Sequence, residues 1–388
     1  MEALNARRQR LAGLARAVRA AVVVPSLFAL ALLVIRQPEV AGFAVFGTFA
    51  HLVMVDYDPA GRARSGESAM LTVLGVVMVS LGTLASANVW LAVGGAIVVG
   101  FLTEFSPLAS GRIAAVRTAL LLSFMLGVAV PASVSSVFPY LAGWLLAGLV
   151  AQPVLLLLWA PLQTGNVVGE GEAARERITD PVSIAGSLTW IGNATGTGVA
   201  MGLAVLLTRL LKLDHAFWVV LGVLPILSAK GTSVTHTFWQ QQVGTLIGCL
   251  VGASLVAIIG AHQAWYWLTL PFIVFASTYA ASTVGFMAGQ AAFTVFAVVL
   301  FCILLPQQGQ VGILRVEDIA IGGAVSLVVG SLRRLGEARP MDCLRGLMLV
   351  QSSQILATRD ENGIILRSLR MGVPTRANAD LYRQRAHR

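Results

Sequence analysis

Apolar runs of about twenty residues recur along almost the whole chain, and they constrain its fold more than any other feature. Such a run is long enough to cross a bilayer as a helix. The runs are continuous rather than alternating, which argues against a transmembrane barrel. The sequence therefore predicts an all-α, polytopic membrane protein with about twelve transmembrane helices. The expected ranges are 18–35, 39–55, 68–87, 89–107, 114–131, 138–159, 187–208, 214–229, 241–260, 264–281, 286–305 and 316–335.

Composition supports a membrane protein and excludes several other classes. Hydrophobic residues make up 57% of the 388 residues and charged residues 12%, with mean hydropathy +0.80. Soluble domains carry about 25% charged residues. There is no P-loop, HExxH, nucleophile elbow or paired cysteine, so we expect no enzyme, cofactor or metal.

Basic residues predict the orientation in the membrane. If the N-terminus is cytoplasmic, all but four of the 27 Lys and Arg residues fall in cytoplasmic segments. This asymmetry follows the positive-inside rule. We expect a multi-pass protein of the bacterial inner membrane, with both termini cytoplasmic and an uncleaved first span. The four exceptions are Arg36, Arg209, Lys212 and Arg315.

The two halves of the chain correspond at an offset of about 175 residues. FAVFGTF at 43–49 aligns with FWVVLGV at 217–223, and Thr72-Val-Leu-Gly75 aligns with Thr245-Leu-Ile-Gly248. This predicts two parallel six-helix repeats. The expected division is a basic N-terminal segment 1–17, a first repeat 18–159, a cytoplasmic linker 160–186, a second repeat 187–335 and a basic cytoplasmic tail 336–388.

Residues 216–260 resemble the fusaric acid resistance and aromatic acid exporter family. The similarity lies in the pair Phe217-Trp218, in Pro225 near the end of the span, and in Gly244-Thr245-Leu-Ile-Gly248. The arginine that the family usually places before Gly-Thr is replaced here by glutamines at 240–242. The resemblance implies proton-driven efflux, by antiport, of small aromatic or other organic acids.

Other functions remain open on the sequence. A passive organic-anion channel would use a related six-span unit, and a major-facilitator-type carrier would transport another substrate. The acidic pair Asp56 and Asp58 also leaves room for a membrane enzyme acting on lipid headgroups. Expected partners are the organic acid, protons, anionic lipid beneath the basic tail, and a second copy or a periplasmic adaptor; nucleic acid is not expected.

Two residues are candidates for proton coupling. Glu104 lies within an apolar run, where a charge is costly, and Arg117 begins the next run at a similar depth. His51 lies in the second run, and histidine is the side chain whose ordinary pKa lies near neutral pH. A structural ion pair and a packing histidine are the alternatives.

The candidate substrate-binding residues are cations, aromatics and amides near the cytoplasmic ends of the spans. They could attract an organic anion, stack on its ring or form hydrogen bonds with its carboxylate or phenol group, although topology signals and interfacial tryptophans give the same pattern. Four glycines are expected to let helices approach closely. The substrate candidates are Arg64, Arg117, Phe217, Trp218, Lys230, Trp239, Gln241 and Gln290, and the packing glycines are Gly75, Gly244, Gly248 and Gly252.

Overall fold

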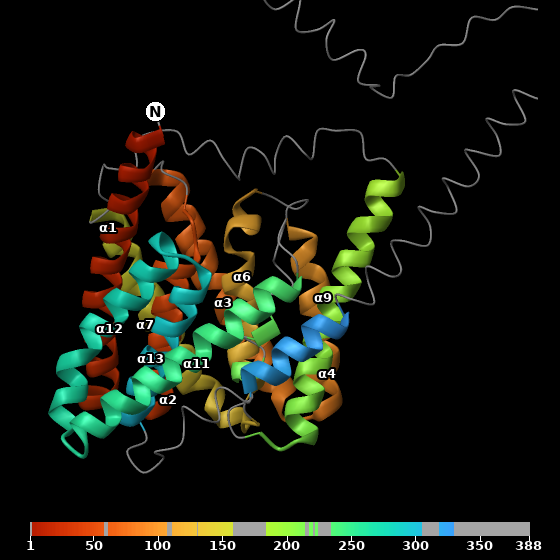
Figure 1. Cartoon of the computed structure of the whole chain (residues 1–388). Coiled ribbons are helices and arrows are strands. Elements are labelled where there is room, and N and C mark those ends of the chain that lie inside the picture. Colours follow the sequence, from red (N-terminus) through yellow and green to blue (C-terminus); the bar gives the residue numbers. More distant parts are fainter. Residues whose placement is uncertain are drawn as a thin grey trace, which may run out of the picture. The chain divides into compact units, whose positions relative to one another are not determined.

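The computed structural model describes residues 2–57, 61–106, 111–129, 131–157, 184–213, 217–219, 222–223, 234–304 and 318–329. The chain divides into two units, Met1–Arg334 and Leu335–Arg388, and the second lies outside the described residues. Most of the predicted linker 160–186 lies outside them as well. Within the described residues the regular structure is helical, without strands, so the predicted all-α class is confirmed (Figure 1).

The first half consists of helices joined by short connections. Two of them, α1 and α2, continue into π-helical turns. Pro38 is the first residue of α2, where a backbone N–H would have no partner within the helix, so proline is tolerated there. The elements are α1 Glu2–Ala29 with η1 Leu30–Ile35, α2 Pro38–Phe49 with η2 Ala50–Met54, α3 Gly61–Ser86, α4 Val89–Glu104, α6 Gly111–Ala129, η3 Val134–Ser136 and α7 Val137–Leu157.

The second half has long helices and two shorter described pieces. Its long elements are α9 Ile184–Leu210, α11 Val234–Ile259, α12 Gln263–Thr283 and α13 Phe286–Leu304. Helical residues at 217–219 and 222–223 lie within the predicted span 214–229, and a helix at 318–329 lies within the predicted span 316–335. Gly260 and Gly285 have φ angles of +60° and +136°, which lets the chain turn after α11 and after α12.

Seven of the described helices are long and apolar enough to cross a membrane, and three more are apolar but shorter. The twelve predicted spans therefore remain a prediction. The shorter helices are Pro38–Met54, Val89–Glu104 and Asp318–Val329. The helix α12 has 21 residues, but its Trp, Tyr, Ser and Thr residues lower its hydropathy.

The helix α3 illustrates how side chains are distributed. Large apolar residues on one face are exposed, whereas the opposite, buried face carries polar groups. This pattern fits a helix that faces lipid outside and protein inside. The exposed residues are Val73, Val77, Leu81 and Leu84, and the buried polar residues are Arg64, Glu67, Ser68, Thr83 and Ser86.

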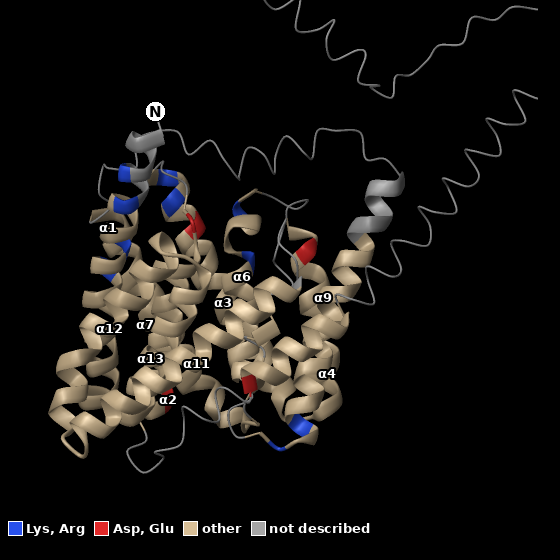
Figure 2. Cartoon of the chain, in the orientation of Figure 1, with Lys and Arg blue, Asp and Glu red and all other residues tan. Residues whose placement is uncertain are grey.

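In two places a helix of one half packs along a helix of the other half. α4 of the first half packs along α9 of the second, and α12 of the second packs along α1 of the first. Figure 2 shows the charged residues of the described helices mostly towards the helix ends, with a largely uncharged band between them. The candidate sites described below lie at the end of the helices that carries most of the arginines.

Candidate functional site

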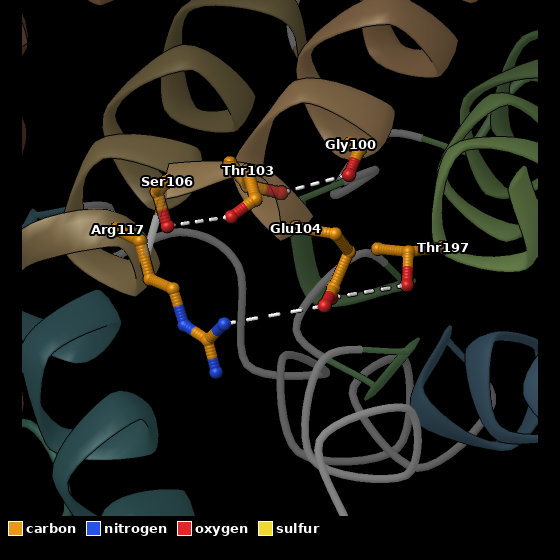
Figure 3. Close-up of polar contacts among 6 residues, drawn as sticks. All are labelled: Gly100, Thr103, Glu104, Ser106, Arg117 and Thr197. Atoms are coloured by element: carbon orange, nitrogen blue, oxygen red, sulfur yellow. Dashed lines mark hydrogen bonds and ion pairs between the residues drawn. The ribbon is translucent and has the colours of Figure 1, made fainter. Parts of the chain in front are cut away.

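Glu104, Arg117 and Thr197 come together from three helices (Figure 3). Glu104 is the last residue of α4, Arg117 lies in the second turn of α6, and Thr197 lies on α9. The Thr197 hydroxyl donates a hydrogen bond to Oε1 of Glu104 at 3.3 Å. Oε2 of the same carboxylate lies 4.0 Å from a guanidinium nitrogen of Arg117. The structure thus brings together the acid and the cation that the sequence placed at similar depth.

Glycines bring α4 and α9 close enough to form this contact. A Cβ atom on Gly198 would lie 2.6 Å from the carbonyl oxygen of Ile97, so the two backbones nearly touch. A Cβ atom on Gly100 would lie 3.1 Å from Cα of Gly198. Thr197 precedes Gly198, and Glu104 lies one helical turn after Gly100. The same close approach therefore places the hydroxyl beside the carboxylate.

Local hydrogen bonds occupy the backbone at the end of α4. The Thr103 hydroxyl donates to the carbonyl of Gly100 at 2.8 Å, and the Ser106 hydroxyl donates to the carbonyl of Thr103 at 2.7 Å (Figure 3). The Thr103 carbonyl lies in the last turn of α4, where carbonyls lack helical partners. The ionised Glu104 carboxylate only accepts hydrogen bonds, and its contacts cross from α4 to α6 and α9.

The Glu104–Arg117 pair is loose and partly accessible. The side chain of Glu104 is 30% exposed and that of Arg117 is 28% exposed. A separation of 4.0 Å is longer than a charge-assisted hydrogen bond, which measures about 2.7–2.9 Å. A second carboxylate could therefore replace Glu104 at Arg117 without breaking a tight bidentate contact. The arrangement is suited to exchange between an internal and an external anion.

His51 lies in η2 and is completely buried. Its Nδ1 atom lies 2.8 Å from the carbonyl oxygen of Gly47, and its Nε2 atom lies 3.1 Å from Oγ1 of Thr72. A carbonyl only accepts, so Nδ1 carries a proton. The Thr72 hydroxyl also lies 2.9 Å from the carbonyl of Ser68. When the His51 ring is neutral, the Thr72 hydroxyl donates to Nε2. When Nε2 is protonated, Nε2 donates to the Thr72 hydroxyl, which then donates to the carbonyl of Ser68. The contact accommodates both protonation states.

Trp144 of α7 covers this histidine. The indole lies 5.4 Å from the His51 ring, centroid to centroid, and its Nε1 donates to the carbonyl of Thr72 at 3.2 Å. A Cβ atom on Gly75 would lie 2.3 Å from the indole, so only glycine leaves room for it. The predicted packing position Gly75 therefore also shapes the surroundings of His51.

Arg64 belongs to a buried polar cluster that the sequence analysis missed. It is 5% exposed, and it lies near Arg19 of α1, which is 7% exposed. Glu67 and Tyr57 are 6% and 7% exposed in the same region. Burial raises the pKa of Tyr57 above its ordinary value, with Glu67 adding to the effect and Ser68 opposing it. The three-residue spacings of Arg16 to Arg19 and of Arg64 to Glu67 were the signal available in the sequence, since both place charges on one helix face.

The predicted aromatic residues have different surroundings. Phe217 and Trp218 are 9% and 1% exposed. Both pack against Phe46 of the first half, with ring centroids 4.8 Å and 6.1 Å away. Trp239 is 60% exposed on α11. None of the three lies in the Glu104 contact, and their roles in substrate binding remain predictions.

The predicted amides connect helices. Nε2 of Gln241 donates to the carbonyl of Gly222 at 3.0 Å, and Nε2 of Gln290 donates to the Thr245 hydroxyl at 3.2 Å. Gln241 is completely buried. These contacts join segments within the protein, and the roles of the two amides in substrate binding remain predictions. Lys230, the remaining substrate candidate, lies outside the described residues.

The predicted packing glycines of α11 face α13. A Cβ atom would lie 2.5 Å from the carbonyl oxygen of Met287 at Gly244, and 2.3 Å from that of Ala291 at Gly248. At Gly252 it would meet the side chain of Val298 at 3.2 Å. Side chains at the first two positions would separate α11 from α13.

The second half carries a recognisable family pattern. The family model described as fusaric acid resistance protein-like matches residues 203–329. Residues 203–329 are similar to the fusaric acid resistance family. This confirms the predicted resemblance for a range extending from the end of α9 to the helix at 318–329. No curated protein and no solved structure matched the chain.

The fusaric acid resistance-like match and the apolar helices together indicate a multi-pass membrane transporter. The matched range includes Gln241, Gln290 and the glycines of α11. It excludes Glu104, Arg117, Thr197 and His51, so the roles of these four residues are argued from their geometry alone.

Proposed function

We propose that this protein is a proton-coupled exporter of small organic acids, aromatic acids among them, in the bacterial inner membrane. The observation that carries the proposal is the contact of Glu104 with Arg117 and Thr197 between the two halves. A titratable acid, a permanent cation and a hydroxyl on three helices are the groups needed to couple a proton to an organic anion.

The coupling step is an exchange at Arg117. When Glu104 is ionised, it lies 4.0 Å from Arg117 and accepts a hydrogen bond from Thr197. When a proton neutralises Glu104, its attraction to Arg117 is lost, and the guanidinium, which stays charged, is available to a substrate carboxylate. A proton on Glu104 and an anion on Arg117 therefore favour each other.

This linkage assigns a direction to the coupling. Because proton and anion load together, the pair by itself supports their movement in the same direction, and acid that accumulates in the cytoplasm leaves with its proton. Antiport, which the family resemblance implies, needs a second titratable group whose protonation opposes substrate binding. His51 is our candidate for a second proton site, since its contacts accommodate both protonation states.

The two six-helix repeats predicted from the sequence belong to this proposal. Gly47 packs on Trp144 in the first half, and Gly222 packs on Ile319 in the second. Both members of the second pair lie about 175 positions after those of the first. The packing of α4 along α9 and of α12 along α1 is also expected of two halves related by an axis along the membrane normal.

The charge distribution supports cytoplasmic termini. Figure 2 shows most of the Lys and Arg positions of the described helices towards the end where α1 begins. Arg209 lies in the last turn of α9, and Lys212 follows that helix. We assign the arginine-rich end to the cytoplasm by the positive-inside rule, which places Glu104 near the cytoplasmic face.

Transport into proteoliposomes with an imposed pH gradient tests the proposal. The probes are a poorly permeant aromatic acid, its neutral amide analogue and chloride. Accumulation of the acid on the alkaline side, lost in Glu104→Gln and kept in the exposed variant Arg112→Gln, supports the exchange at Arg117. Protein-free liposomes measure passive diffusion.

Two results would contradict the mechanism. Accumulation on the acidic side that persists in Glu104→Gln would mean antiport independent of Glu104 and would overturn the exchange at Arg117. Chloride flux that ignores the pH gradient and the Glu104→Gln change would identify a passive anion channel. The variant His51→Asn, measured in the same assay, tests the second proton site.

A further inference from the structure

The buried face of α11 carries two polar side chains that the exchange at Glu104 does not use. Gln241 and Thr245 are both completely buried, whereas Trp239 and Val243 on the opposite face are 60% and 41% exposed. Residues four positions apart on a helix are neighbours, with about 5–6 Å between their Cβ atoms. The two polar side chains therefore lie next to each other inside the protein.

Gln241 presents a buried acceptor without a donor. Its Nε2 atom donates to the carbonyl of Gly222 at 3.0 Å, which fixes the orientation of the amide. Its Oε1 atom is buried and has no hydrogen-bond partner among the described residues. Buried polar atoms in native proteins normally have a partner, because leaving one unsatisfied costs free energy. This oxygen is therefore placed to accept a hydrogen bond from a bound molecule.

The Thr245 hydroxyl complements this acceptor. It accepts a hydrogen bond from Nε2 of Gln290 at 3.2 Å, and a hydroxyl that accepts still has its own proton to donate. The pair thus offers one acceptor and one donor a helical turn apart. A protonated carboxyl group carries the complementary set, an O–H donor and a carbonyl acceptor, whereas a carboxylate has no proton for the Gln241 oxygen.

The charges around the pair also favour an uncharged group. Four elements pack here, and none of their described residues is a lysine or an arginine. The acid among those residues is Asp318, which is 3% exposed, and the histidine, His236, is exposed. An ionised carboxylate buried here would lie without a basic residue on these elements, which is costly. The elements are α11, α13, the helical residues at 217–219 and 222–223, and the helix at 318–329.

The pair lies near the helices of the proposed transport site. Val219 and Val223 flank Gly222 in the sequence and share a buried cluster with Met125 of α6 and Met201 of α9. The same two helices carry the cation and the hydroxyl that contact Glu104. The segment whose carbonyl binds the Gln241 amide is therefore packed against the helices of the first site.

We propose that Gln241 and Thr245 bind the protonated, uncharged carboxyl group of the transported acid. The inference rests on the proposed function and adds one step to it. The protonated carboxyl of Glu104 gives its proton to the substrate carboxylate at Arg117. The O–H bond on Glu104 breaks, an O–H bond forms on the substrate, and Glu104 returns to Arg117 in its ionised form.

The proton transfer and the second site fit together energetically. Donor and acceptor are both carboxylic acids with ordinary pKa values of about 4, so the transfer is nearly balanced in free energy. The product is uncharged and no longer attracted to Arg117. It moves to Gln241 and Thr245, where its O–H group donates to the amide oxygen and its carbonyl accepts from the hydroxyl.

The test measures the binding of uncharged probes to the full-length protein in nanodiscs by isothermal titration calorimetry. Benzamide is a permanently uncharged mimic of benzoic acid that donates and accepts hydrogen bonds, and methyl benzoate only accepts them. We expect saturable binding of benzamide and about tenfold weaker binding of methyl benzoate. Glu104→Gln should keep the affinity for benzamide within about twofold, because the amide needs no proton from Glu104.

Matched variants locate the bound probe. Gln241→Met removes the amide at similar volume and should weaken benzamide binding about tenfold, and Thr245→Val, which removes the hydroxyl, about threefold to tenfold. Thr245→Ser keeps the hydroxyl, and Ser254→Ala changes an exposed residue of the same helix. Both should stay within about twofold of wild type. Thr245→Val remains informative if Gln241→Met fails to fold.

Benzoic acid identifies the protonation state that is bound. Between pH 5 and pH 6 the uncharged fraction of a carboxylic acid falls about tenfold. Its competition with benzamide should weaken by the same factor, measured in Glu104→Gln so that this carboxyl does not titrate. Equal competition at the two pH values would mean that the anion is bound, and the proposal would be wrong.

Three other results would overturn the proposal. They are the absence of saturable benzamide binding, equal affinity for methyl benzoate, and equal affinity in wild type, Gln241→Met and Thr245→Val. The proposed function fails separately. If benzamide binds as expected but a pH gradient does not drive the acid into proteoliposomes, the site for uncharged acids stands and the exchange at Arg117 is wrong.

Discussion

Thr197 donates a hydrogen bond to Glu104 at 3.3 Å and so connects α9 to the end of α4. Three turns further along α9, Arg209 donates to the carbonyls of Ser86 and Val128, at 3.1 Å and 2.9 Å. These contacts lie about 18 Å apart along the helix axis. One helix of the second half is therefore held to three helices of the first, and a shift of α9 would change both ends together.

Replacing Thr197 tests whether this hydrogen bond orients Glu104 for exchange. Thr197→Val keeps the side-chain volume but removes the donor that holds the carboxylate. We expect the rate of proton-coupled transport to fall about tenfold, as for loss of one hydrogen bond to a charged group. The measurement is the initial rate in proteoliposomes across a range of pH.

Thr197→Ser provides the matched control because it retains the hydroxyl. It should keep most of the wild-type rate. Equal loss in Thr197→Ser and Thr197→Val would show that the methyl group, rather than the hydrogen bond, is what matters at this position.

Replacing Gly75 tests the packing around His51. In Gly75→Ala the new methyl group would lie 2.3 Å from the indole of the fully buried Trp144. Such overpacking costs about 1–3 kcal/mol. The midpoint of thermal unfolding in detergent should fall, and proton coupling through His51 should weaken.

Gly94→Ala is the comparison for that experiment. Nothing lies within 4 Å of a Cβ atom at Gly94, so alanine fits. Alanine also favours the helix by about 1 kcal/mol over glycine. The unfolding midpoint should stay equal or rise. A similar fall in both variants would mean that Trp144 does not occupy the space above Gly75.

Replacing Arg209 tests the contact at the other end of α9. The guanidinium satisfies carbonyls at the ends of α3 and α6, where helices leave acceptors without partners. Arg209→Gln should lower the free energy of unfolding by about 1.5–3 kcal/mol. Lys212→Gln, which changes an exposed residue just after the same helix, should have little effect. An unchanged unfolding midpoint in Arg209→Gln would contradict this contact.

Tyr57 should make the protein sensitive to alkaline pH. Burial raises its pKa in the folded protein, whereas the unfolded chain has an ordinary tyrosine pKa of about 10. Above that pH the unfolded chain releases the proton and the folded protein retains it, so stability falls by up to about 1.4 kcal/mol per pH unit. Below it, the effect vanishes.

Thermal unfolding at pH 8 and at pH 11 measures this effect. Tyr57→Phe should lose less stability between the two values than wild type, because phenylalanine has no proton to release. Parallel losses in the two proteins would assign the alkaline sensitivity to other groups.

The helices were predictable because each apolar run specifies its own element. Inside a bilayer a backbone must satisfy its hydrogen bonds within the segment, so an apolar run of about twenty residues becomes a helix wherever its neighbours lie. The ranges predicted for α3, α4 and α13 agree with the structure to within a turn at most ends, apart from an earlier start of α3 at Gly61. The earlier start arises because polar residues such as Arg64 and Glu67 continue the helix beyond the apolar run.

The sites were only partly predictable. Glu104 and Arg117 could be paired because both lie near the ends of adjacent spans, at similar depth. Thr197 is 93 positions from Glu104, and its partner depends on the approach of α4 to α9. The cluster of Arg19, Glu67 and Tyr57 was missed because its contacts also depend on how the helices approach each other. In the sequence, arginines near span ends indicate only the topology.

The sequence by itself determined the membrane class, the helices and the family resemblance of the second half, because hydropathy and short motifs are local properties of the chain. Only the tertiary structure decided which polar groups meet. His51 contacts Thr72 and Thr197 contacts Glu104 because small residues on distant segments let particular helices touch at particular rotations. That rotation depends on side-chain packing over the whole bundle, and no single segment encodes it.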